Sequence, residues 1–300
     1  MKLLKGTPQR RILCTGMNPR EKITIGTLRS RKQERRKISM LTCYDFSTAR
    51  LMEEAGLDSL LVGDTYAEVC LGHPTTLPAT VDHLVTIAEA VRRGAPTAYL
   101  IGDMPFLSYQ VSAPAAIRNA GRFMAAAGCD CVKVEVDRRL VKTVEAMATA
   151  AIPVMAHLGL KPQSIQKLGG YKLQGKQASD ALSIVEDAKM MEEAGAVALL
   201  LEAVPQELAQ IISERTELPV IGCVSGPHCD GQVVVLHDML GYGAGHPPRS
   251  VKQFARLREL LLEAFYTYAK EVAEGIIPTV EESGSMDGAQ LQALRQSLKL

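Results

Sequence analysis

The sequence contains no tryptophan, and aromatic residues make up only 4% of its 300 positions. Proteins that bind single-stranded nucleic acids stack the bases on aromatic side chains, so this scarcity argues against such a function. The formal net charge at pH 7 is only +1, which argues against a nucleic-acid footprint over the whole chain. We therefore expect no nucleic-acid partner.

The sequence also lacks Cys-x-x-Cys pairs and long apolar runs. Its seven cysteines lie mostly within apolar segments, where a free cysteine behaves as a small hydrophobic residue. Such thiols are typical of a reducing compartment, so we expect a cytoplasmic protein. No uninterrupted apolar run reaches the roughly 18 residues of a membrane span, and we expect no membrane partner.

Positive charges are concentrated at the start of the chain, where residues 1–37 contain twelve Lys or Arg and two Glu. Targeting segments are similarly basic and poor in acids. This segment lacks a clear amphipathic apolar face, so an exposed extension is the simpler interpretation. We expect residues 1–24 to form a basic extension, residues 25–278 a single domain and residues 279–300 a C-terminal tail.

The rest of the chain alternates between short apolar segments and segments with helical spacing of apolar residues. Each short segment is apolar throughout, as in parallel strands that are buried on both faces. Eight such repeats predict an α/β fold, a (β/α)8 TIM barrel. A doubly wound open sheet is the competing fold, but no Gly-x-Gly-x-x-Gly turn follows the first strand. The expected strands cover residues 38–43, 59–63, 98–102, 131–135, 153–157, 196–202, 219–223 and 232–236, and the expected helices 27–37, 47–55, 81–93, 114–127, 140–150, 178–194, 206–216 and 252–274.

Four of these apolar runs end on or directly before an acid: Asp64, Asp103, Glu135 and Glu202. In a (β/α)8 barrel the carboxyl ends of the strands surround the active site, so the four carboxylates would meet at one mouth. Converging carboxylates repel each other unless a cation lies between them, and oxygen ligands without a His–Cys cluster suit Mg²⁺. We favour a metal for Asp64 and Asp103, which both follow a glycine. The alternative is that each acid caps the helix after its strand.

Other side chains at the strand ends are candidates for binding or activating a substrate. Lys133 and Glu135 are two residues apart on one strand and point to the same side, which places Lys133 in the mouth, where it could hold a carboxylate. A structural Lys–Glu ion pair is the alternative. Glu202 ends the most apolar strand, where burial would raise its pKa toward that of a general base. His157 is either an orienting hydrogen-bond donor or a buried core histidine.

The sequence around these positions resembles the ketopantoate hydroxymethyltransferase (3-methyl-2-oxobutanoate hydroxymethyltransferase) family. The similar segments follow one another in unbroken order between about Ile25 and Pro278, which makes the resemblance specific. They are MLTCYDFSTARL from Met40, LLVGDT from Leu60, TLPATVD from Thr76, AVRRGAP from Ala90, DMPFLSYQVS from Asp103, VKVE from Val132, HLGLKPQS from His157, LGGYKLQGK from Leu168, LLLEAVP from Leu199 and DGQVVVLHDMLG from Asp230.

The resemblance implies a barrel of the phosphoenolpyruvate/pyruvate type that transfers a hydroxymethyl group from 5,10-methylenetetrahydrofolate to 3-methyl-2-oxobutanoate. The product would be 2-dehydropantoate, in pantothenate biosynthesis, formed through a Mg²⁺-stabilised enolate. The resemblance also implies a homo-oligomer, because family members are often decamers.

The resemblance further implies roles for single residues. Asp64, Asp103 and Glu135 would be the metal group, with Glu135 acting through water. Glu202 would be the catalytic proton acceptor. The residues in contact with the 2-oxo acid would be Asp64, Thr65, Asp103, Lys133 and His157.

Several positions depart from the usual family pattern: Tyr66, Val136, Asp137, Cys223, Val224 and Ser225. These changes keep open a divergent enzyme that performs Mg²⁺-dependent enolate chemistry on another 2-oxo acid or one-carbon donor. A non-catalytic assembly subunit is a third hypothesis, although its site would have no reason to retain all the candidate residues. The Gly169–Gly170 segment is either a moving lid or a plain surface loop.

Overall fold

The computed structural model describes residues 20–243 and 250–300. The described residues divide into two compact units, one of residues 20–236 with 250 and 251, the other of residues 237–243 with 252–300. None of the described helices is long and apolar enough to cross a membrane. The cytoplasmic location stays a prediction.

The first unit contains a closed barrel of eight parallel strands that neighbour one another in sequence order. The first and last strands close it, because Ile38 and Ser39 pair with Gly231 and Gln232. Each expected strand overlaps an observed one, which confirms the predicted (β/α)8 barrel. The strands are β1 (Ile38–Thr42), β2 (Ser59–Val62), β3 (Tyr99–Asp103), β4 (Cys131–Glu135), β5 (Val154–Gly159), β6 (Ala198–Glu202), β7 (Val220–Cys223) and β8 (Gly231–Val234).

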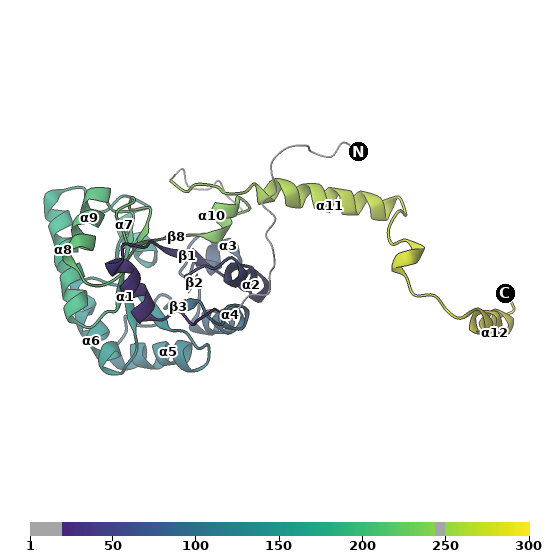
Figure 1. Cartoon of the computed structure of the whole chain (residues 1–300), viewed down its shortest axis with the longest axis horizontal. Helices are drawn as coiled ribbons and strands as arrows, with labels where there is room; N and C mark the ends of the chain where they lie inside the picture. Colours follow the sequence, from purple (N-terminus) through teal and green to yellow (C-terminus); the bar gives the residue numbers. More distant parts are fainter. Residues whose placement is uncertain (1–19, 244–249) are drawn as a thin grey trace. The chain divides into compact units, whose positions relative to one another are not determined.

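Helices surround the strands of this barrel (Figure 1). Polar side chains fix where several begin: Asp45, Thr80 and Ser112 each accept a hydrogen bond from the backbone N–H three residues later. The helices expected from the sequence are α1 (Ile25–Gln33), α2 (Phe46–Glu54), α4 (Val81–Gly94), α5 (Ala113–Ala125), α6 (Val141–Thr149), α8 (Ala178–Glu193) and α9 (Gln206–Arg215). Short elements that the sequence did not predict are α3 (Tyr66–Val69), α7 (Ile165–Leu168), α10 (Leu236–Leu240), η1 (Arg138–Leu140) and η2 (Pro162–Ser164).

Apolar side chains fill the inside of the barrel, as the fold requires. Ile38, Met155 and Ile221 belong to one buried cluster that draws on all eight strands. Ile23 and Leu28, from α1 and the residues before it, belong to the same cluster. Because this cluster includes residues that begin strands, α1 closes the amino end of the barrel and leaves its carboxyl end for a site.

Basic side chains of α1 and the residues before it bind acids at this amino end. The acids are Asp58, Asp130 and Asp230, which directly precede β2, β4 and β8. Their partners from this segment are Arg20 and Arg31 for the first, Lys22 for the second and Lys32 for the third. Arg20 and Lys22 fall within the predicted extension, so residues 20–24 are attached to the barrel. Residues 1–19 lie outside the described residues.

The second unit contains α11 (Leu257–Ala273), η3 (Val280–Glu282) and α12 (Gly288–Leu298). α11 begins five residues later than the predicted helix, which started at residue 252. Neither α11 nor α12 has a buried residue. Large apolar side chains of α11 are exposed, including Phe265, Tyr266 and Tyr268. The predicted domain boundary at residue 278 lies inside this unit and stays a prediction.

Candidate active site

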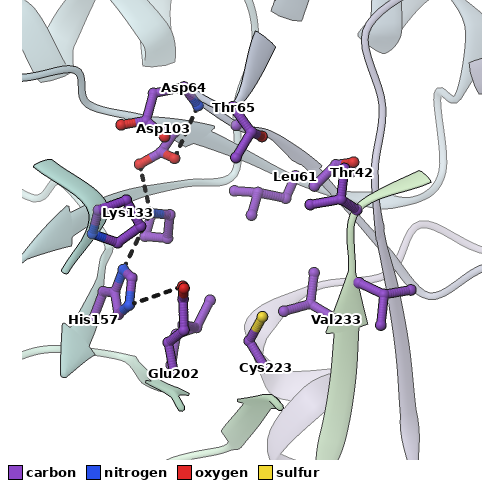
Figure 2. A pocket seen from close by; sticks show the side chains of 15 residues that line it. Thr42, Leu61, Asp64, Thr65, Asp103, Lys133, His157, Glu202, Cys223 and Val233 are labelled. Atoms are coloured by element: carbon purple, nitrogen blue, oxygen red, sulfur yellow. Dashed lines mark hydrogen bonds and ion pairs between the residues drawn. The ribbon is translucent and has the colours of Figure 1, made fainter. Parts of the chain in front are cut away.

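A cavity opens at the carboxyl end of the barrel. Six residues predicted for the site line it: Asp64, Thr65, Asp103, Lys133, His157 and Glu202. Asp64, Asp103, Lys133 and His157 lie together on one side of the cavity, Leu61, Cys223 and Val233 form an apolar wall on the other, and Glu202 lies between the two (Figure 2). The cavity can therefore hold a small molecule with one charged end and one apolar end.

The polar side is built around a buried Lys–Asp pair. The Lys133 Nζ lies 2.8 Å from Asp103 Oδ1, and the Asp64 backbone N–H donates to Asp103 Oδ2 at 3.1 Å. Burial raises the pKa of Asp103 to about 7, with Lys133 acting against this shift and Asp64 adding to it. Burial also acts to lower the pKa of Lys133, but the surrounding carboxylates outweigh it and the pKa is raised. Lys133 is therefore a permanent cation in the cavity.

His157 connects Lys133 to Glu202. Its Nδ1 lies 3.3 Å from Lys133 Nζ, and its Nε2 lies 3.4 Å from Glu202 Oε2. Burial and the charge of Lys133 hold the pKa of His157 well below its usual range, so the ring is neutral. Because an ammonium group only donates, Nδ1 accepts and the ring proton is on Nε2, facing Glu202. His157 Nε2 makes no hydrogen bond within the described residues, so the orienting donor and the core histidine both stay predictions.

Glu202 ends β6, and its side chain retains 20% exposure to solvent. Burial raises the pKa of Glu202 to about 7, and Lys133 acts against this shift. A carboxylate with this pKa is suited to accept a proton near neutral pH. A glycine at position 159 of β5 lets this strand lie close to β6 at Glu202. At its positive φ of +91°, a Cβ would overlap the Glu202 carbonyl.

Glu135 does not line this cavity. Both of its carboxylate oxygens accept from the Gln163 backbone N–H, at 3.2 and 3.1 Å, and its side chain is buried. It lines a second cavity instead, together with Asp137 and Lys161. The structure thus brings Asp64 and Asp103 together at the main cavity and holds Glu135 behind it.

Two residues that the sequence did not single out connect these acids. The Gln163 side chain donates to Asp64 Oδ2 at 2.9 Å. The Tyr109 hydroxyl lies 2.9 Å from Gln163 Oε1 and accepts from the Glu135 backbone N–H at 3.0 Å. Both residues belong to segments that carry the family resemblance, HLGLKPQS and DMPFLSYQVS, but nothing in their spacing indicated a contact with Asp64.

Five of the six departures from the family pattern lie away from the lining of the main cavity, and Cys223 is the exception. Tyr66 begins α3 and packs its ring 6.2 Å from that of Tyr44. Val136 is buried, and Asp137 binds Lys161 Nζ at 2.9 Å. The six predicted residues that line the cavity are thus all retained, and most of the changes affect residues around them.

Val224 is one of the six departures from the family pattern, and its φ is +54°. This left-handed conformation is strained for a β-branched residue. Its side chain is 39% exposed and does not line the cavity, so the valine leaves the described site open. Ser225, next to it, donates its hydroxyl to the Leu201 carbonyl at 2.8 Å and so fixes the loop after β7.

The Gly169–Gly170 segment follows α7, and both glycines have positive φ, +67° and +120°. The next residue, Tyr171, donates its hydroxyl to Glu68 Oε1 at 3.4 Å, which connects this segment to α3. This contact is compatible with both a lid and a surface loop, so both stay predictions.

The donor set at the cavity fits Mg²⁺ better than a metal that needs several protein ligands. Among the described residues, no group of three or more His, Cys, Asp or Glu side chains is arranged to hold a metal. A metal here would have Asp64 and Asp103 as its protein ligands, with water or substrate oxygens completing its shell. Mg²⁺ is bound in this way in many enzymes, through one or two carboxylates.

The barrel has the fold of several solved enzymes that share little sequence with it. Phosphoenolpyruvate phosphomutase from Streptomyces platensis subsp. rosaceus aligns with a TM-score of 0.59 and 14% identity over 92% of this chain and 97% of that one. A 2,3-dimethylmalate lyase, a member of the PEP mutase/isocitrate lyase superfamily, aligns with a TM-score of 0.54 and 18% identity over 92% and 96%. These alignments show that the chain shares the barrel fold of these enzymes, in agreement with the predicted TIM barrel.

The sequence narrows this class to one family. The family model of ketopantoate hydroxymethyltransferase matches residues 22–280. The 3-methyl-2-oxobutanoate hydroxymethyltransferase of Syntrophomonas wolfei subsp. wolfei is 46% identical over 260 residues, covering 87% of this chain and 94% of the relative. That of Geobacillus thermodenitrificans is 47% identical over 241 residues, covering 80% and 86%. The chain belongs to the ketopantoate hydroxymethyltransferase family.

Proposed function

We propose that this protein is a 3-methyl-2-oxobutanoate hydroxymethyltransferase of pantothenate biosynthesis, with 5,10-methylenetetrahydrofolate as the one-carbon donor. The observation that carries the proposal is the place of Glu202, a carboxylate with a pKa raised to about 7 between the polar side and the apolar wall of the cavity. Membership of the family supports the same activity.

The two sides of the cavity match the two ends of the substrate. The carboxylate and carbonyl of the 2-oxo acid would face Lys133 and the Thr65 hydroxyl. The Lys133 charge would attract the carboxylate. The isopropyl group would pack on the apolar wall, which includes Leu61 and Val233. This orientation places the carbon next to the carbonyl toward Glu202.

Glu202 would remove the proton from this carbon, because its pKa near 7 leaves a large fraction ionised at neutral pH. Neutral His157 would orient the carboxylate through its Nε2–H. The electron pair of the broken C–H bond would then form the new bond to the one-carbon unit. Overall, both C–N bonds of the donor's methylene group would break, the oxygen of one water would become the new hydroxyl group, and tetrahydrofolate would leave. Its two nitrogens would take up one proton from this water and the one removed by Glu202. No protein nucleophile is required.

Asp64 and Asp103 would hold Mg²⁺, which supplies Lewis-acid stabilisation of the negative charge on the enolate oxygen. Glu135 would act at a distance, through water, because its carboxylate is bonded to the Gln163 backbone. Lys133 would limit the repulsion between the two aspartates and Glu202 when the three are ionised.

We also propose that the chain forms a homo-oligomer, with the decamer of the family resemblance as the expected state. α11 has no buried residue and exposes Phe265, Tyr266 and Tyr268. Exposed apolar side chains of this number in one helix are typical of an interface between chains. Light scattering on the purified protein would measure the mass, and a monomer would contradict this proposal.

The activity is tested with 3-methyl-2-oxobutanoate carrying deuterium at C3, with Mg²⁺, in the presence and absence of the folate donor. We expect loss of deuterium in both cases and 2-dehydropantoate only with the donor, as measured by nuclear magnetic resonance. Exchange without product would support the divergent enzyme instead. No exchange by folded, Mg²⁺-loaded protein would contradict the proposal and leave the assembly subunit.

A further inference from the structure

Gln163 has a long polar side chain that is buried in η2, directly behind the main cavity. Its side-chain Nε2 donates to Asp64 Oδ2 at 2.9 Å and to the Met104 carbonyl at 3.0 Å. Its Oε1 faces the Tyr109 hydroxyl at 2.9 Å and accepts from Gln110 Nε2 at 3.0 Å. Both ends of the amide are therefore engaged.

These contacts determine which way the amide points. Gln163 Nε2 lies within hydrogen-bond distance of the Met104 carbonyl, which can only accept, so a flipped amide would set its oxygen against that carbonyl. It would also turn an oxygen toward the Asp64 carboxylate. The Gln163 Nε2–H groups are thus held toward Asp64 by a network that cannot invert.

The same residue also holds Glu135, through its backbone. The Gln163 N–H donates to both oxygens of the Glu135 carboxylate, and the Tyr109 hydroxyl bonds to the Glu135 backbone. One residue of η2 therefore fixes two carboxylates, that of Asp64 after β2 and that of Glu135 at the end of β4.

The two aspartates of the cavity differ in the partner that orients them. Asp103 is paired with the charged Lys133, which offsets its charge. Asp64 is bonded to a neutral amide, which orients one oxygen without offsetting the charge. The negative charge of Asp64 thus remains available for a cation, and its direction is fixed before the cation arrives.

We infer that Gln163, supported by Tyr109, is a positioning residue that orients Asp64 for Mg²⁺ binding. The inference rests on the proposed function for the identity of the cation. Partners that orient metal ligands without touching the metal commonly change metal affinity about 10- to 100-fold when they are removed. The bonds of Gln163 to Asp64 and Glu135 make it such a partner for both acids.

The test is a calorimetric titration of Mg²⁺ into the full-length protein in the presence of 3-methyl-2-oxobutanoate. We expect Gln163→Met, which keeps the length of the side chain but loses its donors, to raise the Kd for Mg²⁺ about 10- to 100-fold. Tyr109→Phe leaves the Gln163 amide in place with one hydrogen-bond partner fewer, and we expect a smaller increase in the Kd for Mg²⁺. Gln166→Met is the matched control: Gln166 lies three residues later, is exposed and should leave the Kd unchanged.

Thermal unfolding without Mg²⁺ separates positioning from folding. A merely structural Gln163 would lower Tm in both variants and leave the Kd of the folded protein unchanged, which would overturn the inference. An unchanged Kd in Tyr109→Phe would overturn it even where Gln163→Met fails to fold. Deuterium exchange by the wild type tests the proposed function separately, so a catalytic wild type with unchanged variants contradicts this inference alone.

Discussion

The two ends of the barrel both carry buried or half-buried acids, but they treat the charges differently. At the amino end the acids are Asp58, Asp130 and Asp230, and each is paired with Arg or Lys from residues 20–32. At the carboxyl end the acids that line the cavity are Asp64, Asp103 and Glu202. Among the residues that line this cavity, the positive charge opposite these three acids comes from Lys133.

The acids at the amino end therefore contribute to stability, and those at the carboxyl end to chemistry. Ion pairs at the amino end attach α1 to the barrel and give each of these three acids a basic partner. At the carboxyl end burial raises the pKa of Asp103 and of Glu202 to about 7, which means that their ionised forms are held at a cost in free energy. Groups held in this way can take up a proton or a cation, and they mark functional sites.

The largest expected effect is on proton removal at the carboxyl end. Glu202→Gln keeps the size of the side chain and an oxygen near His157 but cannot accept the proton. We expect the rate of C3 deuterium exchange to fall about 10²- to 10⁴-fold, the usual contribution of a general base. Binding of the 2-oxo acid, measured by calorimetry, should be largely retained. Wild-type exchange in this variant would contradict the assignment of the base.

Removing the positive charge of Lys133 should have the next largest effect. Lys133→Met leaves Asp103 buried without its partner, and breaking a buried pair in this way costs about 3–5 kcal/mol of unfolding free energy. Urea unfolding at pH 7 without Mg²⁺ measures this. The control Lys142→Met removes the exposed pair with Glu145, and we expect a change of less than about 1 kcal/mol. Equal losses in the two variants would refute the account of the buried pair.

The smallest of these effects is on the pH profile. Proton removal requires ionised Glu202, whose raised pKa is about 7. With saturating Mg²⁺, which would keep Asp103 ionised, the kcat/KM for the 2-oxo acid should therefore be level above pH 7 and fall about tenfold for each pH unit below it. His157, with its lowered pKa, stays neutral and Lys133 stays charged across this range, so neither adds a step. A profile that stays level down to pH 5 would exclude Glu202 as the base.

The sequence predicted the barrel because its signals are local. Each strand is apolar throughout and each expected helix has its own spacing, so eight repeats could be counted without knowledge of tertiary contacts. Short elements such as α3 and α7 span only four residues each, too few to show a period. The attachment of residues 20–24 was also missed, because pairing with acids more than thirty residues away leaves no local pattern.

The candidate site was predictable at the strand ends and less so behind them. Asp64, Asp103 and Glu202 each follow an apolar run, and strand geometry alone directs them to the mouth. The same rule placed Glu135 with them, yet its carboxylate is bonded to the backbone of Gln163. Gln163 lies 99 residues from Asp64, and only the folded barrel brings the two together.

One measurement compares the two ends directly: the free energy of urea unfolding at pH 8, without Mg²⁺, for Asp58→Asn and Glu202→Gln. Asp58→Asn weakens the pairs with Arg20 and Arg31 and the bonds from Ser39, so we expect a loss of about 1–3 kcal/mol with unchanged exchange activity. Glu202→Gln removes an acid whose ionised form is unfavourable when folded, so we expect equal or greater stability with the activity lost. A large loss of stability in Glu202→Gln, with none in Asp58→Asn, would contradict the division between the two ends.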